Sequence, residues 1–332
     1  MDKESKRTTI YDIAKLANVS PSAVSSVLNG TWEKRRISRK LFERIMQIAE
    51  EQGYSVNVPA SLLRRERSNI VGMIVPKYDN RYFGEIAEQF EAMARARGFF
   101  PVVTCTQRDP DLEFQAAKEL ISYQAECLIS TGTTDPDRIS AFCKASGIQS
   151  INLDLPGKNA PSVISDNHAA ALELTQLILD RCAQDLDWIG PLRFVGGRLS
   201  DHNTAARLAG FMAAHRDRGI SVPKTHIMST GYSAESAAKV VENFVPEGPT
   251  GLFVNSTISL EGIVRWHSKL ESNSKLVRYG CFDWDPFGSF LPGNVGMIEQ
   301  DVTTMLTKAF ELIGNPNSTN PQILVPCKLR VF

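Results

Sequence analysis

From residue 69 onward the chain alternates short runs of β-branched residues with amphipathic helical segments, and this alternation restricts the fold more than any other feature. It predicts parallel sheets covered by helices on both faces. Because these 264 residues exceed what one compact sheet accommodates, we expect two doubly wound lobes that divide near Ser165. The expected strands are 70–75, 101–105, 127–130, 148–153, 188–195, 251–255 and 276–282, and the expected helices are 85–97, 112–123, 138–145, 167–181, 204–218, 233–244 and 260–270.

The composition excludes several classes of protein. No run of about 18 apolar residues occurs, so we expect no segment that spans a membrane. The first residues, MDKESKRTTIYD, lack the apolar stretch of a secretory signal. The six cysteines form no C-x-x-C pair and have no histidines at metal-ligand spacing, which argues against a zinc site or a disulfide framework. We therefore expect a cytoplasmic protein without a metal or a cofactor.

The charge is distributed unevenly, although 37 Lys and Arg balance 37 Asp and Glu over the whole chain. Residues 1–68 carry 13 basic and 8 acidic side chains, and residues 69–332 carry the remaining 24 and 29. A basic terminal segment on an acidic body suggests that this end of the chain meets a polyanion.

Residues 9–53 carry the signals of three short helices. Thr9 with Asp12 has a capping-box pattern, Ser20 precedes Pro21 at a first helical position, and Ser38 can cap a third helix. Two short helices joined by a turn and closed by a third predict a helix-turn-helix unit, and a generic three-helix cap is the alternative. The apolar residues expected to face its core are Ile13, Leu16, Ala17, Val24, Val27, Leu28, Leu41, Phe42, Ile45, Ile48 and Ala49.

The run YDIAKLANVSPSAVSSVLNG, followed by SRKLFERI and EQGY, resembles the DNA-binding headpiece of the lactose/galactose repressor family of bacterial transcription regulators. The loop between Gly30 and Ser38 is similar in length to that of the fructose-repressor-like branch. The resemblance implies an all-α helix-turn-helix headpiece over 1–53, a hinge helix over 54–68, and a two-lobed, periplasmic-binding-protein-like α/β core over 69–332. The first lobe would comprise about 69–165 and 299–321, and the second about 166–298 and 322–332, with crossings near Ser165, Ile298 and Gln322.

In this family the second helix enters the major groove, so the resemblance implies that Pro21, Ser22 and Ser26 face base edges. Ser26 cannot make the bidentate contact by which an arginine selects guanine, so the usual operator preferences do not carry over. The cations at 34–36 either add base contacts or touch only phosphates. The DNA-binding candidates of the headpiece are Thr9, Tyr11, Ser20, Pro21, Ser22, Ser25, Ser26, Asn29, Lys34, Arg35 and Arg36.

The linker candidates follow a spacing of three. The resemblance implies that Tyr54, Asn57, Ala60 and Leu63 belong to a hinge helix that forms in the minor groove, where Leu63 would part a base step and kink the DNA. The alternative is that Leu63 packs between domains. Arg64 is interpreted as a phosphate contact.

Ligands of doubly wound lobes bind at the carboxyl ends of strands. The pattern places 79–83, Asn255 and Asp283 there, and the family match adds Arg207, Tyr232 and Gln300. Carboxylate, guanidinium, amide and aromatic groups together suit a polyhydroxylated ligand, either a sugar or a sugar phosphate. A salt bridge between the lobes is the alternative for Arg207 and Asp283. The effector-binding candidates are Asp79, Tyr82, Phe83, Arg207, Tyr232, Asn255, Asp283 and Gln300.

We expect no enzymatic function, because neither G-x-G-x-x-G nor a P-loop motif occurs and the five histidines have no metal spacing. The resemblance implies a homodimeric, nucleoid-associated transcription regulator, a repressor by expectation, that binds double-stranded operator DNA. A sugar or sugar phosphate would control it through linkage between effector and operator. An activator or dual regulator, and an α/β enzyme fused to a DNA-binding segment, remain alternatives.

Overall fold

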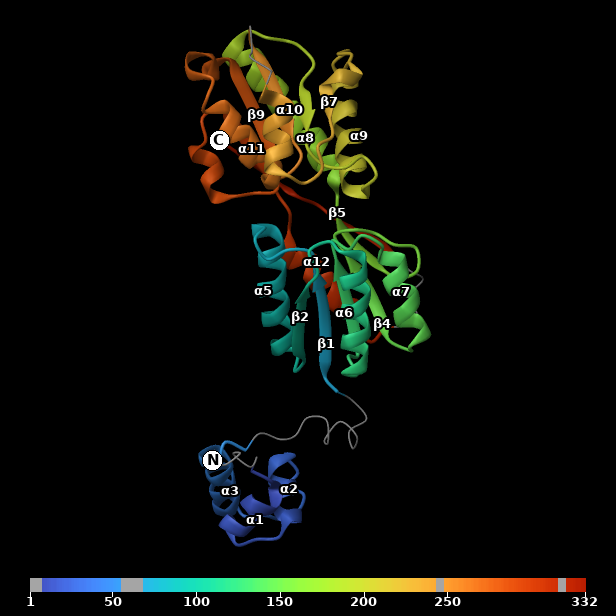
Figure 1. Ribbon diagram of the computed structural model, residues 1–332, viewed down its shortest axis with the longest axis vertical. Helices are drawn as coiled ribbons and strands as arrows, with labels where there is room; N and C mark the ends of the chain where they lie inside the picture. Colours follow the sequence, from blue (N-terminus) through green and yellow to red (C-terminus); the bar gives the residue numbers. More distant parts are fainter. Residues whose placement is uncertain (1–7, 55–67, 243–247, 316–320) are drawn as a thin grey trace, which may run out of the picture. The chain divides into compact units, whose positions relative to one another are not determined.

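The computed structural model describes residues 8–54, 68–242, 248–315 and 321–332. The chain divides into two compact units, Met1–Ser68 and Asn69–Phe332. Figure 1 shows both units. None of the helices within the described ranges is long and apolar enough to cross a membrane.

Within residues 8–54 the first unit consists of α1 (Ile10–Ala17), α2 (Pro21–Leu28) and α3 (Arg39–Glu51). Each helix begins at the expected cap. Thr9 and Asp12 form a complete capping box, and the Ser20 and Ser38 hydroxyls accept hydrogen bonds from the amides of Ala23 and Leu41. These bonds satisfy amides that a helix start otherwise leaves without partners. The helix-turn-helix pattern is therefore confirmed.

The headpiece core forms where α1, α2 and α3 meet. Ile13, Val24 and Ile45 are fully buried in it. Leu16, expected to face this core, is half exposed instead, so that expectation was wrong. The other positions at helical spacing on α1, Ile13 and Ala17 among them, already fill the narrow face that an eight-residue helix buries.

The first lobe of the second unit contains a sheet of order β11-β5-β4-β3-β1-β2, parallel throughout its described pairs. Helices α5 and α12 cover one face and α6 and α7 the other, as the two core clusters show (Figure 1). The strands are β1 (Ile70–Val75), β2 (Phe100–Cys105), β3 (Cys127–Thr131), β4 (Gln149–Leu153), β5 (Ser162–Ser165) and β11 (Gln322–Val325), and the helices are α5 (Arg81–Ala96), α6 (Pro110–Ser122), α7 (Pro136–Ala145) and α12 (Val302–Leu312).

The second lobe contains a sheet of order β12-β10-β9-β8-β6-β7, in which only the β10–β12 pair is antiparallel. Helices α8 and α9 pack on one face and α10 and α11 on the other. The strands are β6 (Arg193–Val195), β7 (Ile227–Met228), β8 (Thr250–Val254), β9 (Val277–Phe282), β10 (Asn294–Glu299) and β12 (Lys328–Val331). The helices are α8 (Asn167–Leu186), α9 (His202–Asp217), α10 (Ala234–Glu242) and α11 (Thr257–His267), with 3₁₀ turns at Lys224–His226, Glu271–Leu276 and Pro286–Phe290.

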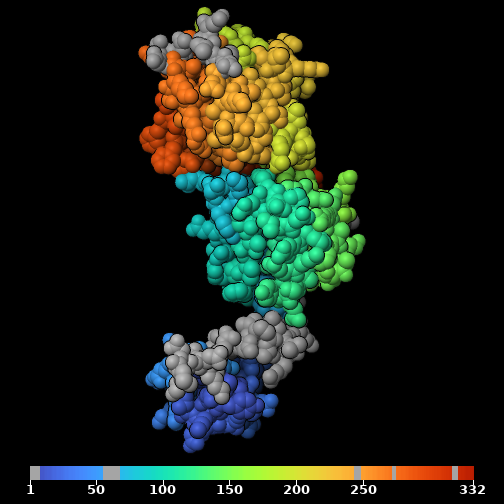
Figure 2. Space-filling view, in the orientation of Figure 1, coloured from blue at the N-terminus to red at the C-terminus, as the bar shows by residue number. Residues whose placement is uncertain are grey.

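The chain passes between the lobes after β5, after β10 and between β11 and β12. The last crossing was expected near Gln322, which was wrong, because Gln322 begins β11 and pairs with Ser162 of the first sheet. Pro326 and Cys327 make that passage instead. The expected strand 188–195 is also shorter, since only Arg193–Val195 joins the sheet. Figure 2 shows the surfaces of the two lobes in contact.

Candidate functional site

The outward face of α2 is polar. Ser22 is exposed, while the Ser26 hydroxyl donates to the Ser22 carbonyl at 2.9 Å. Asn29 donates through its amide to the Ser25 carbonyl at 2.8 Å and to the Ser25 hydroxyl at 3.1 Å. The side chains predicted to read bases are therefore partly engaged within the helix, and a serine face of this kind offers short, adaptable hydrogen-bonding groups to base edges.

Three other DNA-binding candidates have structural roles at helix starts. The hydroxyls of Thr9 and Ser20 cap α1 and α2, and Pro21 is the first residue of α2. These caps help to fix where α1 and α2 begin. Tyr11 is 71% exposed on α1, so its ring is free to meet a partner.

The basic loop that follows α2 is held by its apolar residues. Trp32 packs on Phe42 with ring centroids 4.8 Å apart, and the Ile37 amide donates to the Trp32 carbonyl at 3.0 Å. Lys34, Arg35 and Arg36 are exposed on this ordered turn. The loop therefore presents three cations together, as phosphate contacts require.

The linker candidates are only partly described. Tyr54 packs against the headpiece core, and its amide donates to the Ala49 carbonyl at 2.8 Å. Asn57, Ala60, Leu63 and Arg64 lie outside the described residues, so their predicted roles stay predictions.

A cleft lies between the two lobes of the second unit, at the carboxyl ends of the strands. It holds only about 30 Å³ of free space, room for one or two water molecules, because side chains of the two lobes meet across it. A ligand of sugar size must therefore displace some of these contacts. The cleft is lined by Asn80, Tyr82, Phe83, Arg108, Asp154, Asn203, Arg207, Tyr232, Ser256, Ile258, Asp283 and Gln300.

Arg207 is the buried cation of the cleft and is fixed on several sides. Its Nε donates to Asn167 Oδ1 at 2.7 Å and its Nη1 donates to the Asn255 carbonyl at 2.6 Å. The guanidinium stacks 3.6 Å from the ring centroid of Phe282, and Nη2 lies 3.9 Å from Asp283 Oδ1. These contacts hold the guanidinium in one orientation, with a donor directed at Asp283.

Two carboxylates face this guanidinium from different lobes. Asp154 Oδ1 accepts from the Tyr82 hydroxyl at 3.1 Å and from Asn203 Nδ2 at 3.0 Å, and the second bond joins the lobes. Asp283 Oδ1 accepts from Gln300 Nε2 at 2.7 Å. Burial raises the pKa of Asp154 to about 6, against the opposing charge of Arg207. Burial likewise raises the pKa of Asp283.

A second guanidinium, that of Arg108, reaches the cleft from the loop after β2. It lies 4.7 Å from the ring centroid of Tyr232 and 5.7 Å from that of Phe83. The Tyr232 hydroxyl lies 3.2 Å from the Thr204 hydroxyl. Arg108 therefore joins the first lobe to an aromatic ring of the second through a cation–π contact.

Most of the predicted effector residues lie in this cleft. Tyr82, Phe83, Arg207, Tyr232, Asp283 and Gln300 line it, although α5 begins earlier than expected and carries the first two on its initial turn. Asn255 is fully buried and acts on the cleft through its carbonyl bond to Arg207. Asp79 was misplaced by the prediction. Its side chain is 77% exposed and lies 3.8 Å from Lys77, outside the cleft, while the neighbouring Asn80 caps α5 and lines the cleft.

Sequence reasoning missed Arg108, Asp154, Asn203, Ser256 and Ile258 as lining residues, and it included Asn80 only as part of the segment 79–83. The rule that found Asp283 also covers Asp154 and Arg108, since both come shortly after a strand of a parallel sheet. Asn203 lies four residues before Arg207, on the same face of α9. Over the described ranges, no group of three His, Cys, Asp or Glu side chains is arranged to hold a metal ion.

A helix-turn-helix headpiece on a two-lobed α/β core with a polar interlobe cleft defines a ligand-responsive DNA-binding regulator. The family models agree. One, described as bacterial regulatory proteins of the lacI family, matches residues 9–57. Another, described as periplasmic binding proteins and sugar binding domain of the LacI family, matches residues 68–316. The chain belongs to the LacI family, and the resemblance seen in the sequence is confirmed.

Individual relatives are regulators of sugar and polyol operons. The ribitol operon repressor of Klebsiella aerogenes is 55% identical over 193 residues, which cover 58% of this chain and 72% of the relative. The fructose operon regulatory protein of Vibrio cholerae is 29% identical over 332 residues, 97% of this chain and 99% of the relative. The lac repressor dimer bound to operator and the anti-inducer ONPF has the same fold, with a TM-score of 0.77 at 20% identity over 98% of both chains. The protein is a LacI-family regulator of transcription that binds DNA through its headpiece.

Proposed function

We propose that the protein is a repressor that binds a pseudo-palindromic operator as a homodimer and responds to an uncharged acyclic polyol, with ribitol as the first candidate. The observation that carries this proposal is the balanced charge of the cleft. Two carboxylates, Asp154 and Asp283, face two guanidiniums, Arg108 and Arg207. The ribitol operon repressor among the relatives supports the choice of a pentitol.

The buried carboxylates favour an uncharged ligand over a phosphorylated one. A phosphate ester carries about −1.5 to −2 charge at neutral pH. In this cleft it would meet Asp154 and Asp283, and their like charges would oppose it in surroundings where water screens poorly. Polyol hydroxyls, in contrast, donate to carboxylates and accept from guanidiniums.

The aromatic rings favour an acyclic ligand. A pyranose commonly offers an apolar face to an aromatic ring. Arg108 already stacks on both Phe83 and Tyr232. A flexible chain of hydroxyl-bearing carbons can pair with the polar groups without displacing that guanidinium.

The dimer is supported by an apolar surface of the second lobe. Phe287 and Phe290 are 67% and 80% exposed beside a groove that Leu260, Val264 and Leu291 line. Exposed aromatic patches of this kind mark surfaces that a partner covers. The structurally similar lac repressor binds its operator as a dimer, and two copies of this headpiece would match an operator with two-fold symmetry. The proposed place of action is the nucleoid, in the cytoplasm.

The experiment is a titration of ribitol against a preformed complex of the full chain with operator DNA. Ribitol is expected to change operator affinity. Ribitol 5-phosphate should produce the same change only at a concentration at least about 10-fold higher. Asp154→Asn and Asp283→Asn should each raise the effective ribitol concentration by roughly 10- to 150-fold, the value of a charge-assisted hydrogen bond. Repression, as opposed to activation, predicts that the bound protein lowers transcription from the operator-bearing promoter in vitro.

The matched control is Asp79→Asn, which neutralises an exposed carboxylate outside the cleft. It should respond to ribitol as the wild type does. A stronger effect of ribitol 5-phosphate than of ribitol, or equal sensitivity of the Asp79 and Asp154 variants, would refute the assignment of the cleft.

A further inference from the structure

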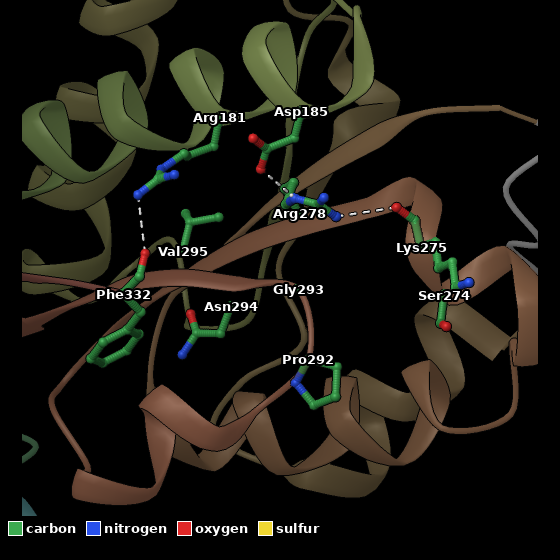
Figure 3. Close-up of a pocket in the computed structure, with 10 residues that line it drawn as sticks. All are labelled: Arg181, Asp185, Ser274, Lys275, Arg278, Pro292, Gly293, Asn294, Val295 and Phe332. Carbon is green, nitrogen blue, oxygen red and sulfur yellow. Dashed lines mark hydrogen bonds and ion pairs between the residues drawn. The ribbon is translucent and has the colours of Figure 1, made fainter.

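We propose that the second lobe has an additional binding site, for a small phosphate monoester that carries hydroxyl groups, in a cavity far from the interlobe cleft. This cavity, the distal pocket, is bordered by Arg181, Asp185, Lys275, Arg278, Asn294 and Phe332 (Figure 3). Its volume is about 460 Å³, within the range of about 300–1,000 Å³ typical of small-molecule sites. It is thus already open to a ligand, whereas the cleft is filled by its own side chains.

The distal pocket is cationic. Three basic side chains, Arg181, Lys275 and Arg278, face a single acidic one, Asp185. Arg278 is already committed, because its Nε donates to Asp185 at 2.8 Å and its Nη1 donates to the carbonyls of Lys275 and Val277. Asp185 is therefore neutralised by Arg278, and the other two cations are left to attract an anion.

Those two cations retain donors for a ligand. Arg181 donates one hydrogen bond, from Nη2 to the main-chain oxygen of Phe332 at 3.1 Å. The Lys275 side chain is exposed and takes part in none of the ion pairs found among the described residues. Figure 3 shows Arg181 and Asp185 projecting from α8 toward the strand that carries Arg278. A guanidinium and an ammonium at one cavity suit the oxygens of a phosphate group.

A neutral polar group beside the cations indicates hydroxyls on the ligand. Asn294, at the start of β10, is only 9% exposed, and its Nδ2 donates to the Gly288 carbonyl at 2.9 Å. Its Oδ1 is buried and has no hydrogen-bond partner among the described residues. A buried acceptor without a donor is costly, and a ligand hydroxyl that reaches it would relieve the cost.

The distal pocket and the cleft lie at opposite ends of the same elements. Helix α8 has Asn167, the partner of Arg207, in its first turn and Arg181 near its end. Strand β9 has Arg278 near its start and leads into Asp283, and β10 likewise begins at the distal pocket and leads into the cleft. Arg181 lies fourteen residues after Asn167 along the helix, a rise of about 21 Å, so the two sites are distinct.

The test is calorimetric titration of the full chain with glycerol 3-phosphate, with glycerol as the uncharged counterpart. We expect saturable binding of one glycerol 3-phosphate per chain and none of glycerol at the same concentrations. Arg181→Gln should weaken binding about 10-fold or more, as loss of a charge-assisted bond does. Lys275→Gln should weaken it roughly 2- to 5-fold, because its ammonium is exposed.

Lys239→Gln is the matched control, since Lys239 is an exposed lysine of the same lobe on α10, outside the distal pocket. It should bind as the wild type does. Arg108→Gln alters the cleft alone and should also leave glycerol 3-phosphate affinity unchanged. If Arg181→Gln unfolds, Lys275→Gln decides the matter, because the Lys275 side chain is exposed and in no ion pair among the described residues, so its loss should not disturb the fold. Absence of saturable binding, unchanged affinity in the distal variants, or loss of binding in Arg108→Gln would each overturn the proposal.

Discussion

If Asp154 binds the ligand as proposed, its burial assists the ligand at the expense of the stability of the empty protein. Asp154 is 5% exposed, and the opposite charge that acts on it most strongly, Arg207, is shared with Asp283. Burial favours the protonated form, which raises the pKa of Asp154 from 3.8 to about 6. Asp154→Asn keeps an oxygen that can accept from Tyr82 and Asn203, and it removes the charge.

The size of the effect follows from the pKa. Between pH 3.8 and about 6 the folded state binds more protons than the unfolded state, so stability falls as pH rises through this window. One pKa unit corresponds to about 1.36 kcal/mol, so the ionised Asp154 lowers the free energy of unfolding at pH 7.5 by up to about 3 kcal/mol. Asp154→Asn should recover this amount, a rise in Tm of roughly 5 °C for a core of this size.

The assay is calorimetric melting of wild type and Asp154→Asn between pH 4.5 and 7.5 without ligand. The variant should melt higher than the wild type at pH 7.5, and the difference should shrink toward pH 4.5. The melting temperature of the variant should depend less on pH than that of the wild type. Some dependence should remain, because burial also raises the pKa of Asp283. Asp79→Asn, at an exposed position, should leave both curves unchanged. If Asp154→Asn is destabilised at pH 7.5, the hydrogen bonds of the carboxylate outweigh its burial, and the reasoning fails.

Other perturbations separate the parts of the protein. Ribitol affinity should decline as pH falls below about 6, where Asp154 takes up a proton, and a flat binding profile from pH 5 to 7.5 would contradict this. Ile45→Ala should cost the headpiece about 2–5 kcal/mol and abolish operator binding in gel-shift assays, while ribitol binding by calorimetry stays unchanged. Phe290→Asp should shift the protein toward monomer in sedimentation at micromolar concentration, and an unchanged dimer would place the interface elsewhere. Arg207→Ala should leave operator affinity nearly intact and remove the response to ribitol, provided that circular dichroism shows it folded; a response at the wild-type midpoint would exclude Arg207 from the site.

Helices whose start depends only on neighbouring residues were predicted from the sequence. The caps Thr9, Ser20 and Ser38 start the helices of the headpiece because a hydroxyl three residues ahead satisfies a free amide, and this depends on neighbours in sequence alone. The alternation of strands and helices predicted both sheets for the same reason. The expected elements did not include β5, β7, β10, β11, β12 or α12. Four of these strands are only two to four residues long, and β11 and β12 are mostly exposed or half-buried, so they carry little hydrophobic pattern. Strand β10 and helix α12 are longer and largely buried, and they were missed despite their apolar residues.

The set of residues in the cleft depends both on local sequence and on packing between distant segments. That Asp283 lies at the interlobe cleft follows from its place after a strand, which the sequence alone contains. That Asp154 and Asn203 meet at 3.0 Å, 49 residues apart, depends on how two lobes close on each other, as does the contact of Arg108 with Tyr232. Asp79 and Asn80 are neighbours with the same local pattern, yet one is exposed and the other lines the cleft, because the turn into α5 directs successive side chains oppositely. The local sequence therefore determined which helices and strands form and where the polar residues at their ends lie. Only packing between distant segments decided which of those polar residues meet in the buried interlobe cleft, where their charges balance.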